Sequence, residues 1–240
     1  MWIEGRNPVR EALRAGRPIR RLLIAEGTSR VDDIVEAARS SHVRVERVPR
    51  SHIDGFVSGV HQGVAAETDD FVYRSWREGL VLASERGELA LFLALDGITD
   101  PHNVGSLLRS AEAAGAHAAI LPARRASPVT AVVEKAAAGA TSHLIVDQVT
   151  NLQRTLAEAK EAGVWIVALD MDGEADLFDH PLLVEPVAIV VGAEGSGVSR
   201  LVRERADARV RIPMSGRTAS LNAGVAGAIA MFETKRQRRL

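Results

Sequence analysis

The chain has 240 residues, of which 46% are hydrophobic and 25% are charged, and its formal net charge is −1. This composition is ordinary for a globular protein of one or two domains, and a charge near zero gives no general sign of a nucleic-acid partner. The absence of cysteine excludes disulfides, thiolate nucleophiles and cysteine-based zinc sites. No apolar run reaches the roughly 20 residues of a membrane span, and none follows Met1, so we expect a cytoplasmic protein without a membrane partner.

Positive charge is concentrated at the two ends of the chain. The basic residues are Arg6, Arg10, Arg14, Arg17, Arg20 and Arg21 near the start, and Lys235, Arg236, Arg238 and Arg239 near the end. Two such patches on a neutral chain predict contact with a polyanion. A solvated helix face and a disordered tail would give the same pattern and are the structural alternatives.

The first part of the chain alternates short strands and helices. Asn7 followed by Pro8 is typical of a helix start, with Asn as the cap and Pro at the first helical position. A second helix is expected over 31–42, and the predicted strands are 20–25, 43–48 and 60–67. We expect a small α/β domain over 1–72, followed by a polar and less regular linker over 73–88.

From residue 89 to 240 a second domain shows a regular alternation. Its predicted strands are 90–96, 117–122, 143–149, 164–170, 187–192 and 208–213, and its predicted helices are 103–115, 128–139, 151–163, 198–206 and one from Ser220. Nearly continuous apolar strands between helices indicate an α/β fold with a parallel sheet that is covered on both faces. Ligands bind such sheets at the carboxyl ends of the strands, so the loops 96–106, 192–198 and 213–222 are candidate site loops.

The first loop lies in LDGITDPHNVGSLLRSAEAAG (95–115). Asn103 is a candidate helix cap. Arg109 lies among apolar residues of the following helix, so we expect it to be largely covered and to need an anionic partner. The two residues are about 240° apart around a helix, so both reach one ligand only if Asn103 points back from the cap. A plain cap and an internal salt bridge are the structural alternatives.

The second loop lies in VAIVVGAEGSGVSRLV (187–202). Its glycine spacing is G-x-x-G-x-G, which differs from the dinucleotide fingerprint G-x-G-x-x-G, and the Gly-Lys-Ser/Thr of a P-loop is absent. Glu194 lies inside the turn, where a carboxylate would repel a phosphate bound at the helix start. The turn therefore predicts a ligand without phosphate at this point, and a carboxylate that complements the helix dipole is the structural alternative.

The third loop lies in IPMSGRTASLNAGVAGAIAMFE (212–233). Arg217 and Thr218 project polar groups from a turn, and Ser220 is a candidate helix cap. The Ala/Gly-rich run that follows allows another backbone to approach closely. A helix capped by Ser220 leaves Asn222 unexplained, because Asn is a poor helix former in a first turn.

Together and in this order, DPHNVGSLLRSAEAAG, IVVGAEGSGVSRL and IPMSGRTASLNAGVAGAIAMFE resemble the three signature motifs of the SpoU/TrmH family of RNA 2′-O-ribose methyltransferases. The N-terminal IEGRNPVREAL and VHQGVAAE resemble a small ribosomal-protein-like RNA-binding domain. That domain occurs in the branch that modifies a guanosine of 23S ribosomal RNA. The resemblance implies methyl transfer from S-adenosylmethionine to a ribose 2′-OH, a C-terminal deep trefoil knot in the sheet, and a homodimer through the knotted domain.

The resemblance also implies which residues form the site, with no metal among its groups. Matched motif by motif, the catalytic positions are Asn103, Arg109, Glu194, Ser220 and Asn222, and the cofactor-binding positions are Leu169, Gly192, Ile212, Met214 and Leu221. The family favours an arginine as the base, but arginine is deprotonated only at very high pH. We therefore expect Arg109 chiefly to hold the target phosphate and to polarise the hydroxyl.

Three alternatives stay open. Transfer RNA is a possible substrate, and the basic tail 235–239 is consistent with it. A catalytically silent RNA-binding protein would keep both domains without the reaction. A nicotinamide-dependent oxidoreductase, from another class, would use a doubly wound sheet, but the glycine spacing and Glu194 argue against it.

Overall fold

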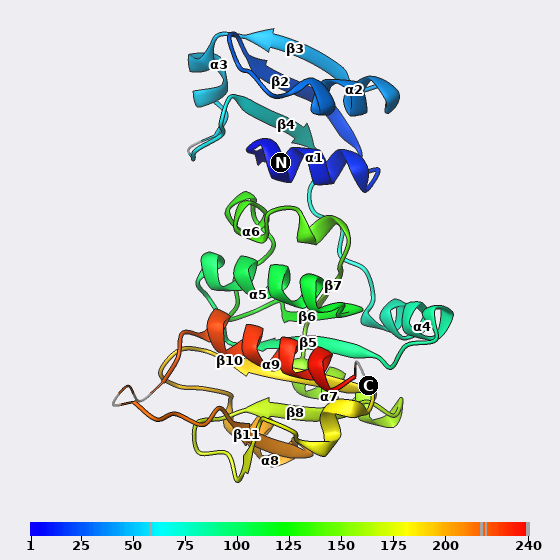
Figure 1. The fold of residues 1–240 in the computed structure, drawn as a ribbon, viewed down its shortest axis with the longest axis vertical. Coiled ribbons are helices and arrows are strands. Elements are labelled where there is room, and N and C mark those ends of the chain that lie inside the picture. The colour runs from blue at the N-terminus through cyan, green and yellow to red at the C-terminus, as the bar shows by residue number, and fades with distance from the viewer. Residues whose placement is uncertain (58, 217, 219, 239–240) are drawn as a thin grey trace. The chain divides into compact units, whose positions relative to one another are not determined.

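The computed structural model describes residues 1–57, 59–216, 218 and 220–238, and its elements are labelled in Figure 1. Arg217, predicted to project from the third loop, and Arg239 of the basic tail lie outside the described residues. The chain forms two compact units. Unit 1 comprises Met1–Val72 and Val129–His143, and unit 2 comprises Tyr73–Pro128 and Leu144–Leu240.

Unit 1 is built on a four-stranded sheet with the order β1-β4-β2-β3. Its elements are β1 (Trp2–Glu4), α1 (Arg6–Arg14), β2 (Ile19–Ala25), α2 (Asp32–Ser40), β3 (Arg44–Val48), α3 (Arg50–Asp54), β4 (Val64–Thr68), α6 (Ala131–Ala137) and the 3-10 turn η1 (Ala140–Ser142). Strand β4 pairs antiparallel with β1 and β2, whereas β2 and β3 are parallel. Alternate residues of β2 divide the core: Leu22 and Ile24 pack with α1 and α2, and Leu23 packs with Ile53 of α3.

Two features of unit 1 differ from the sequence-based expectation. Helix α1 begins at Arg6 behind Gly5, whose φ of 99° suits a glycine, so the prediction that Asn7 caps this helix is wrong. Strand β1 and helix α3 were not predicted, because three and five residues are too few to show a period. Strand β1 forms because it pairs with β4, a contact between distant parts of the chain.

Unit 2 contains a seven-stranded sheet with the order β7-β6-β5-β10-β8-β11-β9, in which every neighbouring pair is parallel. The predicted α/β fold with a parallel sheet is confirmed. The strands are β5 (Leu91–Asp96), β6 (Ala118–Pro122), β7 (Ile145–Val149), β8 (Trp165–Leu169), β9 (Ala175–Asp176), β10 (Val187–Gly192) and β11 (Ala208–Arg211). The helices are α4 (Trp76–Arg86), α5 (Pro101–Ala114), α7 (Leu152–Glu161), η2 (Pro181–Val184), α8 (Arg200–Arg205) and α9 (Ala223–Gln237).

The helices of unit 2 cover both faces of the sheet. Residues of α4, α7 and α8 share one apolar core with alternate residues of the strands, whereas α5 and α9 pack against each other on β5 and β10 (Figure 1). Strands β6 and β7 continue from β5 to one side of the sheet, and β10 lies between β5 and β8. The direction of the strand order therefore changes at β5 and β10, which is where such sheets place a ligand. The trefoil knot stays a prediction from the family resemblance.

The segment 73–88, predicted as a linker, contains helix α4. Ser75 and Glu78 form a reciprocal capping box at its start, with bonds of 3.3 and 3.1 Å. Trp76 is only 2% exposed and packs edge-on against Phe92, with ring centroids 6.0 Å apart. The capping box was the signal for this helix in the sequence. The domain limits 1–72, 73–88 and 89–240 stay a prediction.

Candidate functional site

Helix α5 starts at the carboxyl edge of the sheet and is capped by Asp100. Its carboxylate accepts hydrogen bonds from the backbone N–H groups of His102 and Asn103, both 3.2 Å long, and Pro101 occupies the first helical position. Asn103, the candidate cap, is therefore not the residue that caps this helix. Because Asp100 satisfies the free N–H groups, the Asn103 side chain is available for other contacts.

Helix α9 begins at the third loop and is capped by Asn222, not by Ser220 as predicted. The Oδ1 atom of Asn222 accepts a hydrogen bond of 3.2 Å from the backbone N–H of Val225. Asn is among the preferred residues at a cap although it is unfavourable inside a helix, and this explains its presence here. Ser220 lies before the helix, exposed to solvent.

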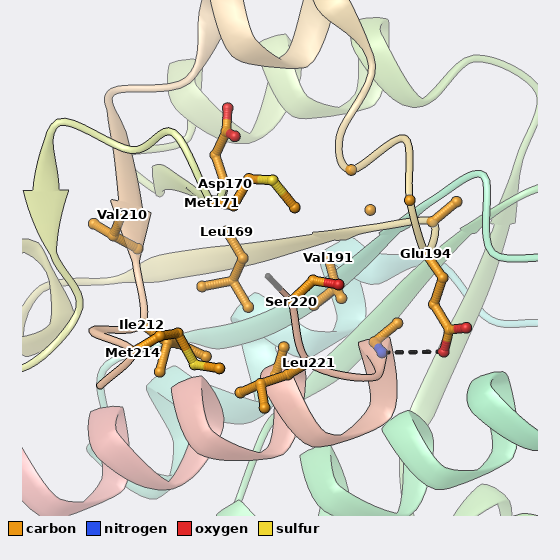
Figure 2. Close-up of a pocket in the computed structure, with 16 residues that line it drawn as sticks. Leu169, Asp170, Met171, Val191, Glu194, Val210, Ile212, Met214, Ser220 and Leu221 are labelled. Carbon is orange, nitrogen blue, oxygen red and sulfur yellow. Dashed lines mark hydrogen bonds between the residues drawn. The ribbon is translucent and has the colours of Figure 1, made fainter. Parts of the chain in front are cut away.

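One polar cluster joins the three predicted motifs. The carboxylate oxygen Oε1 of Glu194 accepts hydrogen bonds from Asn103 Nδ2 at 3.0 Å and from Asn222 Nδ2 at 2.5 Å. The Nδ2 group of Asn222 also donates to Asn103 Oδ1 at 2.8 Å. The backbone N–H of Ala223 reaches Glu194 at 3.4 Å, a contact drawn as a dashed line in Figure 2. We call Asn103, Glu194 and Asn222 the amide–carboxylate cluster. Three donors on one oxygen fix the orientation of this carboxylate.

Arg109 lies apart from this cluster. Its side chain is exposed, whereas Leu107 and Leu108 beside it are fully buried. Among the residues that the structure describes, Arg109 has neither an ion-pair partner nor a contact with the amide–carboxylate cluster. The expectation of a largely covered arginine is wrong, because the buried side of α5 is formed by its apolar residues and Arg109 points outward.

A pocket opens beside the amide–carboxylate cluster, between the ends of β8, β10 and β11 and the loop before α9 (Figure 2). The residues that line it include all five predicted to bind a cofactor, namely Leu169, Gly192, Ile212, Met214 and Leu221. Glu194 and Ser220 line it as well. The side chains of Ile212, Met214 and Leu221 lie together on one side of the pocket (Figure 2). The pocket thus combines an apolar wall with a polar rim.

Gly192 ends β10 at the back of this pocket. A Cβ atom added there would lie 2.1 Å from the carbonyl carbon of Gly197 and 2.2 Å from the nitrogen of Val198, so no side chain fits. The turn itself is closed by a hydrogen bond of 2.8 Å from the N–H of Gly197 to the carbonyl of Ala193. The glycine spacing in this turn therefore serves the close approach of two backbone segments.

Sequence reasoning missed Asp170, which also lines the pocket and is only 4% exposed. Its Oδ2 atom lies 3.1 Å from Nε of Arg203 and 3.8 Å from a guanidinium nitrogen of Arg209. The 3.1 Å contact lacks the alignment of a hydrogen bond, so the pair is held by charge. Arg203 also donates to the carbonyl of Ser196 at 3.4 Å. Arg203 therefore connects the end of β8 to the turn that carries Glu194.

The two predicted basic patches are mostly occupied by intramolecular contacts. Near the start of the chain, the pairs are Arg6 with the Gln62 carbonyl, Arg10 with Asp33, Arg14 with Glu11, Arg17 with Glu134, Arg20 with Asp69 and Arg21 with Glu67. Near the end, Arg236 pairs with Glu233 and Asp179. Arg238 donates to four backbone carbonyls, and its burial lowers its pKa to about 10. These particular arginines are thus engaged within the protein and are less available to a polyanion than unpaired arginines would be.

Within the described ranges, no helix is both long enough and apolar enough to cross a bilayer.

Two family sequence models match the chain and together span most of it. Residues 90–232 match the SpoU rRNA Methylase family. Residues 2–74 match the RNA 2′-O ribose methyltransferase substrate binding family.

Similar sequences extend over the whole chain. A Bacillus subtilis protein named as a TrmH family tRNA/rRNA methyltransferase is 40% identical over 239 residues, which cover 99% of this chain and 96% of the relative. An uncharacterized tRNA/rRNA methyltransferase of a Mycobacterium species (strain KMS) is 44% identical over 239 residues, covering 98% of this chain and 76% of the relative.

Solved structures with the same architecture were also found. The SpoU methyltransferase AviRb from Streptomyces viridochromogenes, in complex with AdoMet, matches with a TM-score of 0.77 and 27% identity, covering 99% of this chain and 90% of AviRb. An RNA 2′-O ribose methyltransferase matches with a TM-score of 0.80 and 26% identity, covering 100% of this chain and 89% of that chain. A third structure, described as the A. aeolicus TrmH/SpoU tRNA modifying enzyme, matches with a TM-score of 0.57 and 28% identity, covering 63% of this chain and 76% of that chain.

Proposed function

Because this chain belongs to the SpoU rRNA methylase family, and is thus an RNA methyltransferase that uses S-adenosylmethionine, we propose that it methylates the ribose 2′-OH of a guanosine in 23S ribosomal RNA. The match of residues 2–74 to a substrate-binding family supports ribosomal RNA, since the tRNA modifying enzyme of A. aeolicus matches only 63% of this chain. Family membership also removes the nicotinamide-dependent alternative.

We further propose three functional segments. Residues 1–72 bind the RNA, 73–88 connect this part to the rest, and 89–240 carry out methyl transfer. The extents of the two family matches, 2–74 and 90–232, support these limits.

The pocket residues fit S-adenosylmethionine. The apolar surfaces of Ile212, Met214 and Leu221 suit the adenine ring and the thioether carbons. The carboxylates of Asp170 and Glu194 place negative charge on the wall of the same pocket, which suits a cofactor whose sulfonium and amino groups are positive. Gly192 lets the turn at Gly197 and Val198 pack directly on the end of β10, so the turn that carries Glu194 lies close to the pocket.

When bound, the cofactor supplies an electrophilic methyl group. The residues of the chain must bring the 2′-OH into line with that methyl group and assist the loss of the hydroxyl proton. We assign this orienting role to the amide–carboxylate cluster, with Ser220 beside it. The observation that carries the proposal is that Asn103 and Asn222, from two separate motifs, both bond to Glu194 of a third, which lines the pocket.

We assign to Arg109 the binding of the target phosphate. An exposed guanidinium without a carboxylate partner among the described residues is available for an external anion, and its planar fork matches phosphate oxygens. We also propose a homodimer through α9. Val225 and Phe232 are 49% and 48% exposed on this helix, and an interface between two copies would cover them.

Mapping of ribose methylation in total RNA tests the proposed substrate. RNA from cells with and without the protein is compared, and we expect one guanosine of 23S ribosomal RNA to lose its 2′-O-methyl group when the protein is absent. Loss of a mark in transfer RNA instead would replace the proposed substrate. Calorimetry that detects no S-adenosylmethionine binding would support the catalytically silent alternative.

A further inference from the structure

A loop with two exposed arginines follows β6. Arg124 and Arg125 are both exposed, and within the described part of the chain neither makes an ion pair or a hydrogen bond. The arginines at the start of the chain, by contrast, all have acceptors inside the protein, as Arg10 has in Asp33. Of these two sets, Arg124 and Arg125 therefore carry the positive charge that is unpaired within the described residues, whereas the arginines from Arg6 to Arg21 are paired.

The loop is ordered by backbone contacts at both of its ends. The N–H of Ala123 donates to the carbonyl of Val149 at 2.8 Å, and the N–H of Ser127 donates to the carbonyl of Ile98 at 3.1 Å. Between them, Arg125 has a φ of 58°, in the left-handed region that residues other than glycine rarely adopt. Such backbone strain persists where the surrounding structure holds it, and it is frequent at binding sites.

The same contacts place the loop at the edge of the sheet that carries the amide–carboxylate cluster. Strands β5 and β6 run parallel with Ala94 opposite Ile120, so both end at the same edge of the sheet. The tether to Ile98 lies five residues before Asn103, a stretch of chain that spans at most about 18 Å. An extended RNA strand whose target ribose lay at the cluster would carry its neighbouring phosphates within reach of this loop.

Three acidic groups at this edge, all among the described residues, form no ion pair with the arginines of the loop, because each accepts hydrogen bonds from other groups. Asp96 accepts the N–H of Ser199 at 2.6 Å, Asp100 caps α5, and Glu194 belongs to the amide–carboxylate cluster. Arginine that is exposed and has no internal partner is the typical ligand of RNA phosphates, which fix the register of the strand without reading its sequence.

We propose that Arg124 and Arg125 bind phosphates that flank the target nucleotide and thereby position its ribose at the amide–carboxylate cluster. The inference rests on the proposed RNA methyl transfer and adds the surface that holds the substrate. Because the contacts are made before and during the reaction alike, their loss raises the KM for RNA and leaves kcat at saturating RNA unchanged.

The test uses the full chain with both arginines replaced, Arg124→Ala together with Arg125→Gly. Glycine accepts the left-handed backbone at position 125, so this variant removes the charge without adding strain. The control is Arg86→Ala, since Arg86 is also exposed and has no partner among the described residues, but it precedes β5 at the opposite edge of the sheet. A second double variant, Arg124→Lys with Arg125→Lys, keeps the charge.

Methyl transfer is measured with labelled S-adenosylmethionine on total RNA from cells that lack the protein, and RNA binding is measured by filter retention at several salt concentrations. For the charge-removing variant we expect about a tenfold higher KM for RNA. The slope of log K against log salt should fall by about 1.4, for two contacts with a single strand. The lysine variant should keep most of that slope, and Arg86→Ala should behave as the wild type.

A wild-type KM and salt slope in the charge-removing variant would overturn the inference, and so would an equal loss in Arg86→Ala. If the wild type labels transfer RNA and not 23S RNA, the proposed substrate fails, and the arginines are judged on the RNA that is labelled. If no RNA is labelled, the proposed reaction fails, and the arginines are judged by the salt dependence of 23S RNA binding alone.

Discussion

Asn222 donates a hydrogen bond of 2.8 Å to the side-chain oxygen of Asn103, although 119 positions separate the two residues in the chain. The same Nδ2 group lies 2.5 Å from Glu194, and the Oδ1 atom of Asn222 caps helix α9. One side chain thus stabilises a helix and also orders the candidate site. These two roles can be separated by substitution.

Asn222→Ala should lower the free energy of unfolding by about 1 kcal/mol, the usual effect of losing a helix cap, and should abolish methyl transfer. Asn222→Ser is the matched variant, because serine caps a helix as well as asparagine does but cannot replace the two amide contacts. We expect its stability in urea to lie within about 0.5 kcal/mol of the wild type. Its methylation rate should be at least about a hundredfold lower, and a rate near that of the wild type would contradict the catalytic assignment of Asn222.

Gly192→Ala should disrupt the pocket, because the added Cβ atom would lie 2.1 Å from the backbone of Gly197. The atoms that the Cβ would meet belong to the main chain and cannot rotate away. The strand or the turn must therefore move, at a cost of about 3 kcal/mol. We expect weaker S-adenosylmethionine binding by calorimetry, together with lower stability. Gly216→Ala is the control, since nothing lies within 4 Å of a Cβ atom there. Cofactor affinity within twofold of the wild type in Gly192→Ala would show that the turn does not shape the cofactor site.

Arg203→Met should weaken cofactor binding, because Asp170 would lose its nearest cation and the turn that carries Glu194 would lose its contact at Ser196. We expect a destabilisation of about 2 kcal/mol, less than for a fully isolated buried charge, because Arg209 stays 3.8 Å from Asp170. Arg203→Lys should restore part of both properties. In the control Arg200→Met, which breaks an exposed pair with Glu204 on the same helix, cofactor affinity should not change.

The stability of the protein should fall as the pH drops from about 4.5 toward 2. Hydrogen bonds from Arg236, from the backbone N–H of Asp179 and from Gln237 lower the pKa of Glu233 to about 2. The folded state therefore binds fewer protons than the unfolded state over this range, where an unfolded glutamate titrates near about 4.3, and acid favours unfolding. Urea unfolding at several pH values should show a shallower decline in Glu233→Gln than in the wild type. Equal slopes for the two proteins would rule out this source of acid sensitivity.

Arg109→Lys tests whether the planar guanidinium is required. If Arg109 grips a phosphate with two parallel hydrogen bonds, lysine keeps the charge but loses the fork, and kcat/KM should fall by about tenfold or more. The control is Arg109→Ala, which should be worse than lysine. Wild-type turnover by Arg109→Lys would show that the planar guanidinium is not required. A pH–rate profile that shows one clear ionisation near neutrality would favour a conventional base elsewhere in the site.

Much of unit 2 could be predicted because buried strands and helices show apolar patterns within short stretches of sequence. The run from 90 to 96 was expected as a buried strand, and β5 occupies Leu91–Asp96. The candidate caps, which depended on competition between neighbouring groups, were wrong: Asp100 and not Asn103 caps α5, and Asn222 and not Ser220 caps α9. A cap is decided by where the first helical turn begins, and several polar residues near a helix start satisfy the pattern equally well.

The order of the strands across the sheet cannot be read from local periods. Strand β10 enters between β5 and β8, with Gly192 opposite Asp96, and this long-range pairing brings Glu194 beside Asn103. The sequence specified most of the helices of unit 2, its buried strands and the three motifs, since these depend on neighbours within a few residues. The side-chain contacts of the site, the outward position of Arg109 and the pairing of the terminal arginines depend on packing between distant segments, and they could be established only from the folded chain.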